Sequence, residues 1–234
     1  MTAIVDARIP PTAEKALSDR GFAIVKLPPH PALPDPVASH PDMLLFFAQD
    51  AVYCTKSYHE TAKNELAMIA LAAQRPLVIL KDELGATYPH DIRLNAAPVG
   101  SCLFCLPTHT ENEIKEGYRI VPVRQGYAKC STVPVGERAL ITADPSIARA
   151  ASVNQLDVLK IRAGYVTLPC YNTGFLGGAS SFAPYGGTRE IFFCGNLATH
   201  PAHAAITAFC NNHGFETVSL TDEPLTDVGT IFLI

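Results

Sequence analysis

The sequence predicts an α/β protein made of five copies of one strand–strand–helix unit, closed into a ring by its N-terminal strand. Two features repeat in every unit: a helical pattern before a short apolar strand, and a polar junction before a second apolar stretch. The junctions recur at nearly constant spacing: 49, 39, 48 and 49 residues separate Asp42, Asp91, Cys130, Gly178 and Asp227. The alternative is an ordinary α/β sandwich with accidental spacing.

The strands that follow the helical patterns are short, apolar and rich in β-branched residues. They are predicted at 22–27, 76–80, 118–123, 157–161 and 215–220. The helices before them are predicted at 11–17, 57–74, 110–116, 145–151 and 201–212. Asp144 is a predicted N-cap with Pro145 at the first helical position, and Thr110 and Glu113 are in capping-box register.

The stretch 126–142, near the middle of the chain, gives the clearest example of one unit. Its pattern predicts a strand, a tight turn containing Gly136 and a second strand. Cys130 stands between Lys129 and Ser131 where the first of these strands begins. The junctions are therefore the first places to look for chemistry.

The two ends of the chain complement each other. The last unit stops at Ile234 without a helix, whereas the first unit begins with the apolar residues 3–5 and then a helix. The N-terminal segment is therefore expected to complete the fifth unit, which removes the exposed sheet edge of an open array. We expect one domain spanning residues 1–234.

The composition is typical of a folded protein with no attraction to polyanions. Of the 234 residues, 48% are apolar and 17% are charged, which is enough apolar material for a buried core. A net charge of −4 gives no reason to expect nucleic acid or an anionic membrane as a partner. The N-terminus lacks a signal-peptide pattern, no apolar run could cross a bilayer, and the seven Cys are scattered. We expect a cytoplasmic protein with reduced thiols.

Five stretches, 5–10, 40–42, 88–92, 125–131 and 174–179, carry a resemblance to a known group of proteins. Through them the sequence is similar to an uncharacterised bacterial family of the guanidine-modifying-enzyme fold, also called the pentein or α/β-propeller fold. The fold includes arginine deiminases, dimethylarginine dimethylaminohydrolase and amidinotransferases, and also a ribosome-binding factor without catalysis. The resemblance implies a ring of five ββα-type units and leaves open an enzyme or a binding protein.

In the catalytic members a Cys nucleophile, a His and carboxylates line a central channel. Cys130, followed by Ser131 and Thr132, resembles the nucleophile segment, and His40 with Asp42 resembles the His-x-Asp segment. The resemblance thus implies Cys130 as nucleophile and His40 as its acid–base partner. In those enzymes the Cys lies in the last unit, so the assignment here is rotated around the ring, and their Glu-x-Gly-Asp pattern is absent.

The residues themselves suggest further roles for the junctions. Lys129 is expected to lower the pKa of the neighbouring thiol toward the reactive thiolate. Carboxylates at a channel mouth suit a guanidinium or an amine. The predicted substrate-binding residues are Asp42, Asp91, Asp227, Lys129, Asn95 and Asn172. The alternatives are structural: a small buried Cys, His-Pro-Asp turn chemistry, and carboxylates that bond turn backbone.

No metal site and no cofactor are predicted. Cys102 and Cys105 lie three residues apart in a strand-like run, which places them on opposite faces. His200 and His203 lack an acidic partner motif, and the chain has neither a phosphate loop nor a dinucleotide-binding glycine pattern.

These observations lead to one predicted function and one alternative. The first is a thiol-dependent hydrolase or transferase acting on a small guanidino or amidino compound through a thiouronium-type intermediate. The alternative is a non-catalytic protein that binds a small cationic ligand or a macromolecular partner. A Cys130 close to His40 would favour the enzyme, and a Cys130 in apolar surroundings would favour the binding protein.

Overall fold

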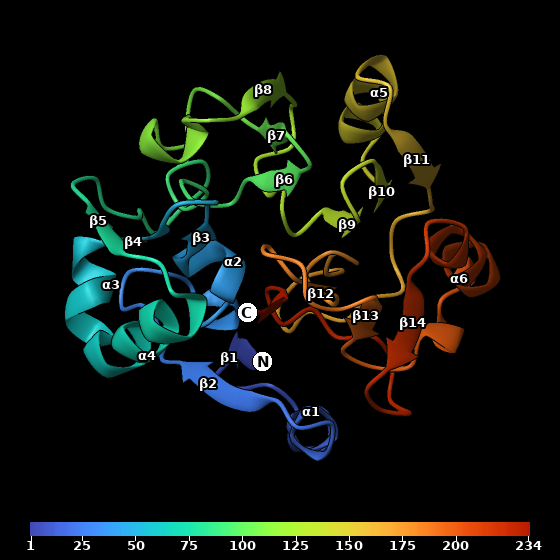
Figure 1. The fold of residues 1–234 in the computed structure, drawn as a ribbon, viewed down its shortest axis with the longest axis horizontal. Coiled ribbons are helices and arrows are strands. Elements are labelled where there is room, and N and C mark those ends of the chain that lie inside the picture. Colours follow the sequence, from blue (N-terminus) through green and yellow to red (C-terminus); the bar gives the residue numbers. More distant parts are fainter.

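The computed structural model describes residues 1–234, which form small sheets around a common centre with most of the helices at the periphery (Figure 1). Five sheets contain all the strands. The strands are β1 (Thr2–Asp6), β2 (Ala23–Leu27), β3 (Phe46–Phe47), β4 (Val52–Thr55), β5 (Leu77–Leu80), β6 (Ala97–Val99), β7 (Cys102–Cys105), β8 (Arg119–Pro122), β9 (Thr132–Val135), β10 (Ala139–Thr142), β11 (Asp157–Lys160), β12 (Ser181–Phe182), β13 (Glu190–Phe193), β14 (Glu216–Ser219) and β15 (Ile231–Leu233).

Three sheets follow one plan, in which an antiparallel hairpin is joined by a parallel third strand. They have the orders β3-β4-β5, β6-β7-β8 and β11-β10-β9. In the last of these, Val135 pairs with Ala139 across the turn that contains Gly136. The predicted turn and strand pair of the central stretch are confirmed, although the first strand begins only at Thr132, after the junction.

The other two sheets depart from this plan. Strands β13 and β14 pair in parallel, but the expected hairpin between β12 and β13 is reduced to one bridge, Ser180 to Phe193. Strand β12 pairs instead with β15 in the sheet β12-β15-β1-β2. There β1 lies antiparallel to β15, with Ala3 opposite Leu233, so the first and last strands of the chain are neighbours, as predicted.

The helices agree with the sequence in three of the five units. They are α1 (Pro11–Asp19), α2 (Pro41–Leu44), α3 (Lys56–Thr61), α4 (Lys63–Ala73), α5 (Pro145–Val153) and α6 (His203–Asn212), with short 3₁₀ turns η1 (Asp35–Val37), η2 (Glu113–Lys115) and η3 (Leu197–Thr199). Asp144 caps α5 as predicted, accepting from the N–H groups of Ser146 and Ile147 at 2.8 and 2.9 Å.

Two helix predictions were wrong in extent. The helix predicted at 57–74 is divided into α3 and α4 at Ala62, whose φ of −122° and ψ of 39° are not helical. The helix predicted at 110–116 is only the turn η2, because the Thr110 hydroxyl donates to the carbonyl of Leu106 instead of capping the following turn.

The apolar core is divided into clusters that lie between neighbouring sheets and under the helices. In the largest, Leu66, Ile69 and Ala73 of α4 join Val25 of β2 and Ile4 of β1. The exposed sides of the helices face outward, while the short strands β3, β6, β9 and β12 lie toward the centre (Figure 1). The loops that precede these inner strands therefore end in the middle of the molecule.

Two buried histidines stand in identical His-Pro-Ala segments. The Nδ1 atoms of His30 and His200 accept the N–H groups of Ala32 and Ala202 at 3.1 and 3.0 Å. Both rings are almost fully buried, and burial lowers the pKa of each below its ordinary value. Each segment is thus held by a neutral imidazole.

This arrangement predicts that stability falls in mild acid. A His whose pKa is lowered by folding binds its proton more readily in the unfolded chain, so stability is full above the ordinary His pKa of about 6.5 and declines below it. Urea unfolding at pH 7.5 and pH 5.5 measures the decline. The double variant His30→Asn, His200→Asn keeps an acceptor in each segment and should lose less stability over this range than the wild type. An equal loss in both proteins would contradict the explanation.

Candidate functional site

Side chains from four junctions meet at the centre of the molecule. Asp42 comes from α2, Asn95 precedes β6, Cys130 precedes β9 and Asp227 precedes β15. All four are buried, with no more than 4% of the side chain exposed. Buried polar groups at such a density require partners, so their contacts define what the site can do.

Cys130 is held by two hydrogen bonds. Its Sγ lies 3.1 Å from Asp42 Oδ2, to which the thiol donates, and accepts from Asn95 Nδ2 at 3.0 Å. The side-chain oxygen of Asn95 also accepts the Lys129 N–H at 2.8 Å. Asn95 therefore fixes both the backbone and the sulfur of the Cys130 loop.

Thr230 connects Asp42 with Lys129 and was missed by the sequence analysis. Its hydroxyl donates to Asp42 Oδ2 at 2.8 Å, and Lys129 Nζ donates to the same hydroxyl oxygen at 3.0 Å. In the sequence Thr230 directly precedes the last apolar strand, and nothing marks it as part of a site. Its position directly after Gly229, three residues beyond the junction residue Asp227, could have drawn attention to it.

Burial controls the electrostatics of this cluster. It raises the pKa of the Cys130 thiol well above its ordinary value, and the charges of Asp42 and Asp227 raise it further. The expectation that Lys129 lowers this pKa was wrong. Lys129 is itself almost fully buried, and burial lowers the pKa of its own amine. The resting thiol is therefore protonated.

His40 lies in the same central region but is not among the hydrogen-bond partners of Cys130. Its ring stands between two acids, with Nε2 3.8 Å from Asp6 Oδ2 and Nδ1 3.9 Å from Asp227 Oδ1. Asp6 is in turn paired with Arg8 at 3.0 Å. The acid beside Cys130 is thus Asp42 of the His-x-Asp segment.

Two glycines allow this close packing. A Cβ on Gly229 would lie less than 3.0 Å from the Cβ of His40, and one on Gly178 would be equally close to Asp227 Oδ1. Asp227 is fixed by the N–H groups of Phe175 and Gly229 at 2.8 and 3.0 Å, and burial raises its pKa. Both glycines therefore leave room for the side chains of His40 and Asp227.

The remaining predicted residues lie outside the cluster. Asp91 is buried beside Tyr127, whose hydroxyl donates to its Oδ2 at 2.7 Å, while its Oδ1 has no partner. Burial raises the pKa of this carboxyl. Asn172 is exposed at the surface. Cys102 and Cys105 are buried in two different apolar clusters, and no group of three or more His, Cys, Asp and Glu side chains could hold a metal ion.

A small cavity adjoins the cluster. Its volume is about 10 Å³, close to the space needed for one water molecule. Asp42 and Lys129 are its polar lining, and apolar side chains, among them the ring of Phe182, supply the rest. Asp42 Oδ1 is buried without a partner, so the carboxylate has a free acceptor beside this cavity.

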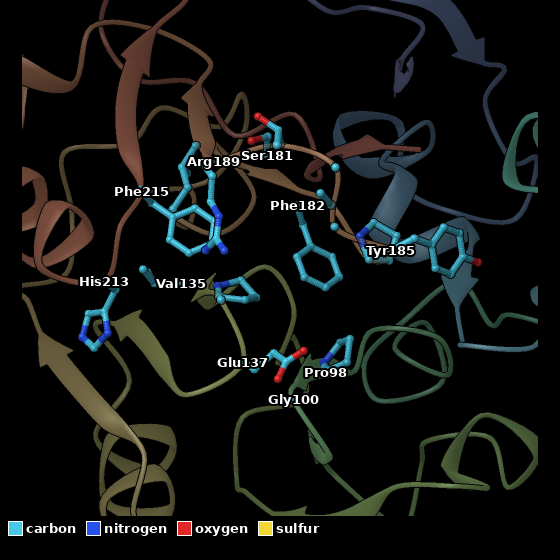
Figure 2. A pocket seen from close by; sticks show the side chains of 18 of the residues that line it. Pro98, Gly100, Val135, Glu137, Ser181, Phe182, Tyr185, Arg189, His213 and Phe215 are labelled. Carbon is cyan, nitrogen blue, oxygen red and sulfur yellow. The ribbon is translucent and has the colours of Figure 1, made fainter.

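A much larger groove lies at the end of the molecule where the hairpins turn. It has a volume of about 940 Å³, within the usual range for ligand pockets, and Figure 2 shows its lining side chains. Phe47, Pro98 and Phe182 line both the groove and the small cavity. The Phe182 ring projects into the middle of the groove (Figure 2). These shared residues separate the surface from the buried cluster.

Removing the Phe182 ring should therefore expose Cys130. In Phe182→Ala, the alkylation of Cys130 by iodoacetamide, followed by peptide mass spectrometry, is expected to be severalfold faster than in the wild type. Phe215→Ala is the matched control, because Phe215 lines the groove but not the small cavity. Equal acceleration in both variants would show that general loosening, and not this ring, controls access.

Comparison of the sequence with protein families gives one match. The model of a family of unknown function (DUF6873) matches residues 4–232. A comparison with curated proteins found no match. No helix has the length and apolar character needed to cross a membrane.

Solved structures share the fold at low identity. Agmatine deiminase of C. jejuni aligns with a TM-score of 0.53 at 9% identity over 93% of this chain and 74% of that one. A cysteine-to-serine mutant of DDAH from Pseudomonas aeruginosa, complexed with citrulline, aligns with 0.50 at 11% identity over 93% and 91%. An amidinotransferase of the saxitoxin biosynthetic pathway from Microseira wollei aligns with 0.50 at 10% identity over 90% and 76%. The chain therefore has a mixed α/β fold of the pentein type.

Proposed function

The chain belongs to the DUF6873 family of unknown function, and we propose that it is a thiol-dependent enzyme acting on a small guanidino or amidino compound. The observation that carries the proposal is the contact between Cys130 Sγ and Asp42 Oδ2, 3.1 Å apart at the centre of the molecule. A thiol beside a carboxylate offers a nucleophile and an acceptor for its proton. The likeness to a deiminase, to DDAH and to an amidinotransferase is consistent with this chemistry.

The proposal takes residues 1–234 as one domain whose sheets form a closed five-bladed ring. The groove then leads from solvent to the centre, past Phe47 and Phe182. The free acceptor of Asp42 would hold a guanidinium N–H, and Asp227 would add negative charge nearby. His40 lies beside Asp227 and opposes the effect of burial, which raises the pKa of that carboxyl, and Asp91 would act from the neighbouring junction. Exposed Asn172 has no part in this proposal.

The reaction would proceed in two steps. In the first, the S–H bond of Cys130 breaks and its proton passes to Asp42, Sγ bonds to the guanidinium carbon, the C–N bond to the leaving group breaks, and a proton returns through Asp42 to the leaving nitrogen. This leaves a thiouronium group on the sulfur. In the second, water in a hydrolase, or an amine in a transferase, attacks that carbon, and the sulfur leaves and recovers a proton.

A second candidate function is favoured by the burial of Cys130. Its thiol has a raised pKa, and the adjoining cavity has room for about one water molecule. A protein that binds a small cationic ligand at Asp42 without turnover would show both properties. The two candidates differ in whether Cys130 is needed.

The deciding experiment is a screen of guanidino and amidino compounds for release of amine or ammonia. Cys130→Ala is expected to lower turnover on the order of 10³-fold or more, as for a removed nucleophile. Cys170→Ser is the control, because Cys170 is an exposed free thiol. A ligand that calorimetry shows to bind wild type and Cys130→Ala equally, with no turnover in either, would establish the second candidate.

A further inference from the structure

A continuous chain of hydrogen bonds runs from the sulfur of Cys130 to the amine of Lys129. Cys130 Sγ is 3.1 Å from Asp42 Oδ2, the Thr230 hydroxyl is 2.8 Å from the same oxygen, and Lys129 Nζ is 3.0 Å from that hydroxyl. All four side chains are buried, and Thr230 is fully so. Because these groups are buried, the chain offers a proton that leaves the thiol a path that needs no bulk water.

The chemistry of each group suits such a transfer. A carboxylate oxygen that accepts from both a thiol and a hydroxyl connects them directly. A hydroxyl can donate and accept, and it turns to suit its partners. The Lys129 amine at the end of the hydrogen-bond chain can accept the proton when it is neutral. His40 is not part of this chain, because its ring nitrogens face Asp6 and Asp227.

The backbone of Thr230 supplies an independent observation. Its φ is +70°, a strained conformation that β-branched residues rarely adopt. The conformation is fixed by a hydrogen bond from the Thr230 N–H to the carbonyl of Gly178 at 2.8 Å. Strain of this kind persists where the surrounding structure needs a side chain in one position. Here that position lies between Lys129 and Asp42.

We propose that Lys129, acting through Thr230 and Asp42, is the group that takes the proton of the Cys130 thiol. The inference rests on the function proposed above, because it assigns the proton acceptor of that nucleophile. The S–H bond breaks and a proton passes to Asp42. Thr230 gives its hydroxyl proton to Lys129 Nζ and receives the one on Asp42. The products are a thiolate and an ammonium, with no other reactant. Lys129 and Thr230 are positioning residues in this assignment, since neither contacts the sulfur.

The surroundings hold the pair in its neutral form at rest. Burial lowers the pKa of Lys129 and raises that of Cys130, so the thiol keeps its proton and a neutral amine is at hand to accept one, while the charges of Asp42 and Asp227 stabilise the ammonium once it forms. The charged groups that face them are Asp42 and Asp227, and His40 in turn faces Asp227. Asn95 donates to the sulfur and would stabilise the thiolate once it forms.

The test measures thiolate formation without any substrate. The rate of Cys130 alkylation by iodoacetamide is followed between pH 6 and 10 by peptide mass spectrometry, with the exposed Cys170 of the same sample as reference. Lys129→Met should raise the apparent pKa of Cys130 by about one unit, which lowers its alkylation at a fixed pH about tenfold. Thr230→Val keeps the Lys129 amine but removes the hydroxyl that is hydrogen-bonded to it, so the ammonium loses a partner and a smaller shift in the same direction is expected. Thr230→Ser restores the hydroxyl and should restore the wild-type profile.

The unmodified protein provides a second measurement should a variant not fold. In NMR titrations, the Cβ of Cys130 and the Cε of Lys129 should change in the same pH range, as coupled groups do. Independent titration of the two carbons, or a profile shifted by His40→Asn but not by Lys129→Met or Thr230→Val, would overturn the assignment. Coupled titration without turnover of any guanidino compound would leave the assignment in place and remove the proposed enzyme instead.

Discussion

Gly229→Ala is expected to lose more than about 4 kcal/mol of stability, which is exceptional for the addition of one methyl group. Two costs combine. Gly229 has a φ of +66°, which costs a residue with a Cβ roughly 1–2 kcal/mol. The new methyl would also lie less than 3.0 Å from the Cβ of His40, which is enclosed by Asp6 and Asp227 and cannot move aside. Urea unfolding followed by circular dichroism measures the loss.

The matched control separates these two costs. Gly117 has a φ of +80°, but a Cβ there would meet no atom within 4 Å. Gly117→Ala should therefore lose only about 1–2 kcal/mol, from the backbone alone. Similar stability losses in Gly229→Ala and Gly117→Ala would mean that the segment carrying His40 moves to make room for the new methyl group, and that the packing of His40 against Gly229 is not rigid.

Asp42→Asn is expected to lose about 3–5 kcal/mol at pH 6, because it removes the carboxylate whose charge raises the pKa of the buried Lys129 most and so stabilises its ammonium. Thr230 joins the two groups, and both are nearly inaccessible to solvent. The double variant Asp42→Asn, Lys129→Met removes both charges and should recover much of the loss. We expect a coupling of about 1–3 kcal/mol in the double-mutant cycle.

An exposed pair in the same protein serves as the control. Lys15 and Asp19 lie on α1 with 2.6 Å between Nζ and Oδ2, and both are largely solvated. Asp19→Asn should change stability by no more than about 0.5 kcal/mol. If the stability losses of Asp42→Asn and Lys129→Met add up to the loss of the double variant, the two side chains are not energetically coupled.

The local elements could be predicted because their signals lie within a few residues. Asp144 and Pro145 specify the start of α5, and the two short apolar runs on either side of Gly136 specify a hairpin. The helix predicted at 57–74 was too long because nothing in its apolar spacing marks the break at Ala62. Helices and hairpins that are specified by a cap or turn within a few residues can thus be predicted from the sequence.

The partners within the site could not be predicted, because they join distant parts of the chain. Asp42 is 88 residues from Cys130 and 188 from Thr230. The repeat predicted that junctions converge, but not that the acid beside the thiol would be Asp42, with His40 turned to Asp6 and Asp227. The position of Cys130 next to Lys129 in the sequence does not show that burial raises the pKa of its thiol, because burial depends on the packing of the whole molecule.

The ring of Phe182 has two neighbours of different kinds. It separates the groove from the central cluster, and the amine of Lys129 lies over its face, 5.4 Å from the ring centroid. An aromatic face attracts an ammonium but not a neutral amine. A ring that swings away therefore makes the protonated amine less stable, and by thermodynamic reciprocity the loss of that proton makes the ring easier to displace. Displacement of the Phe182 ring, which would admit a ligand, is consequently coupled to the protonation of Lys129. The ring is displaced more readily when the amine is neutral.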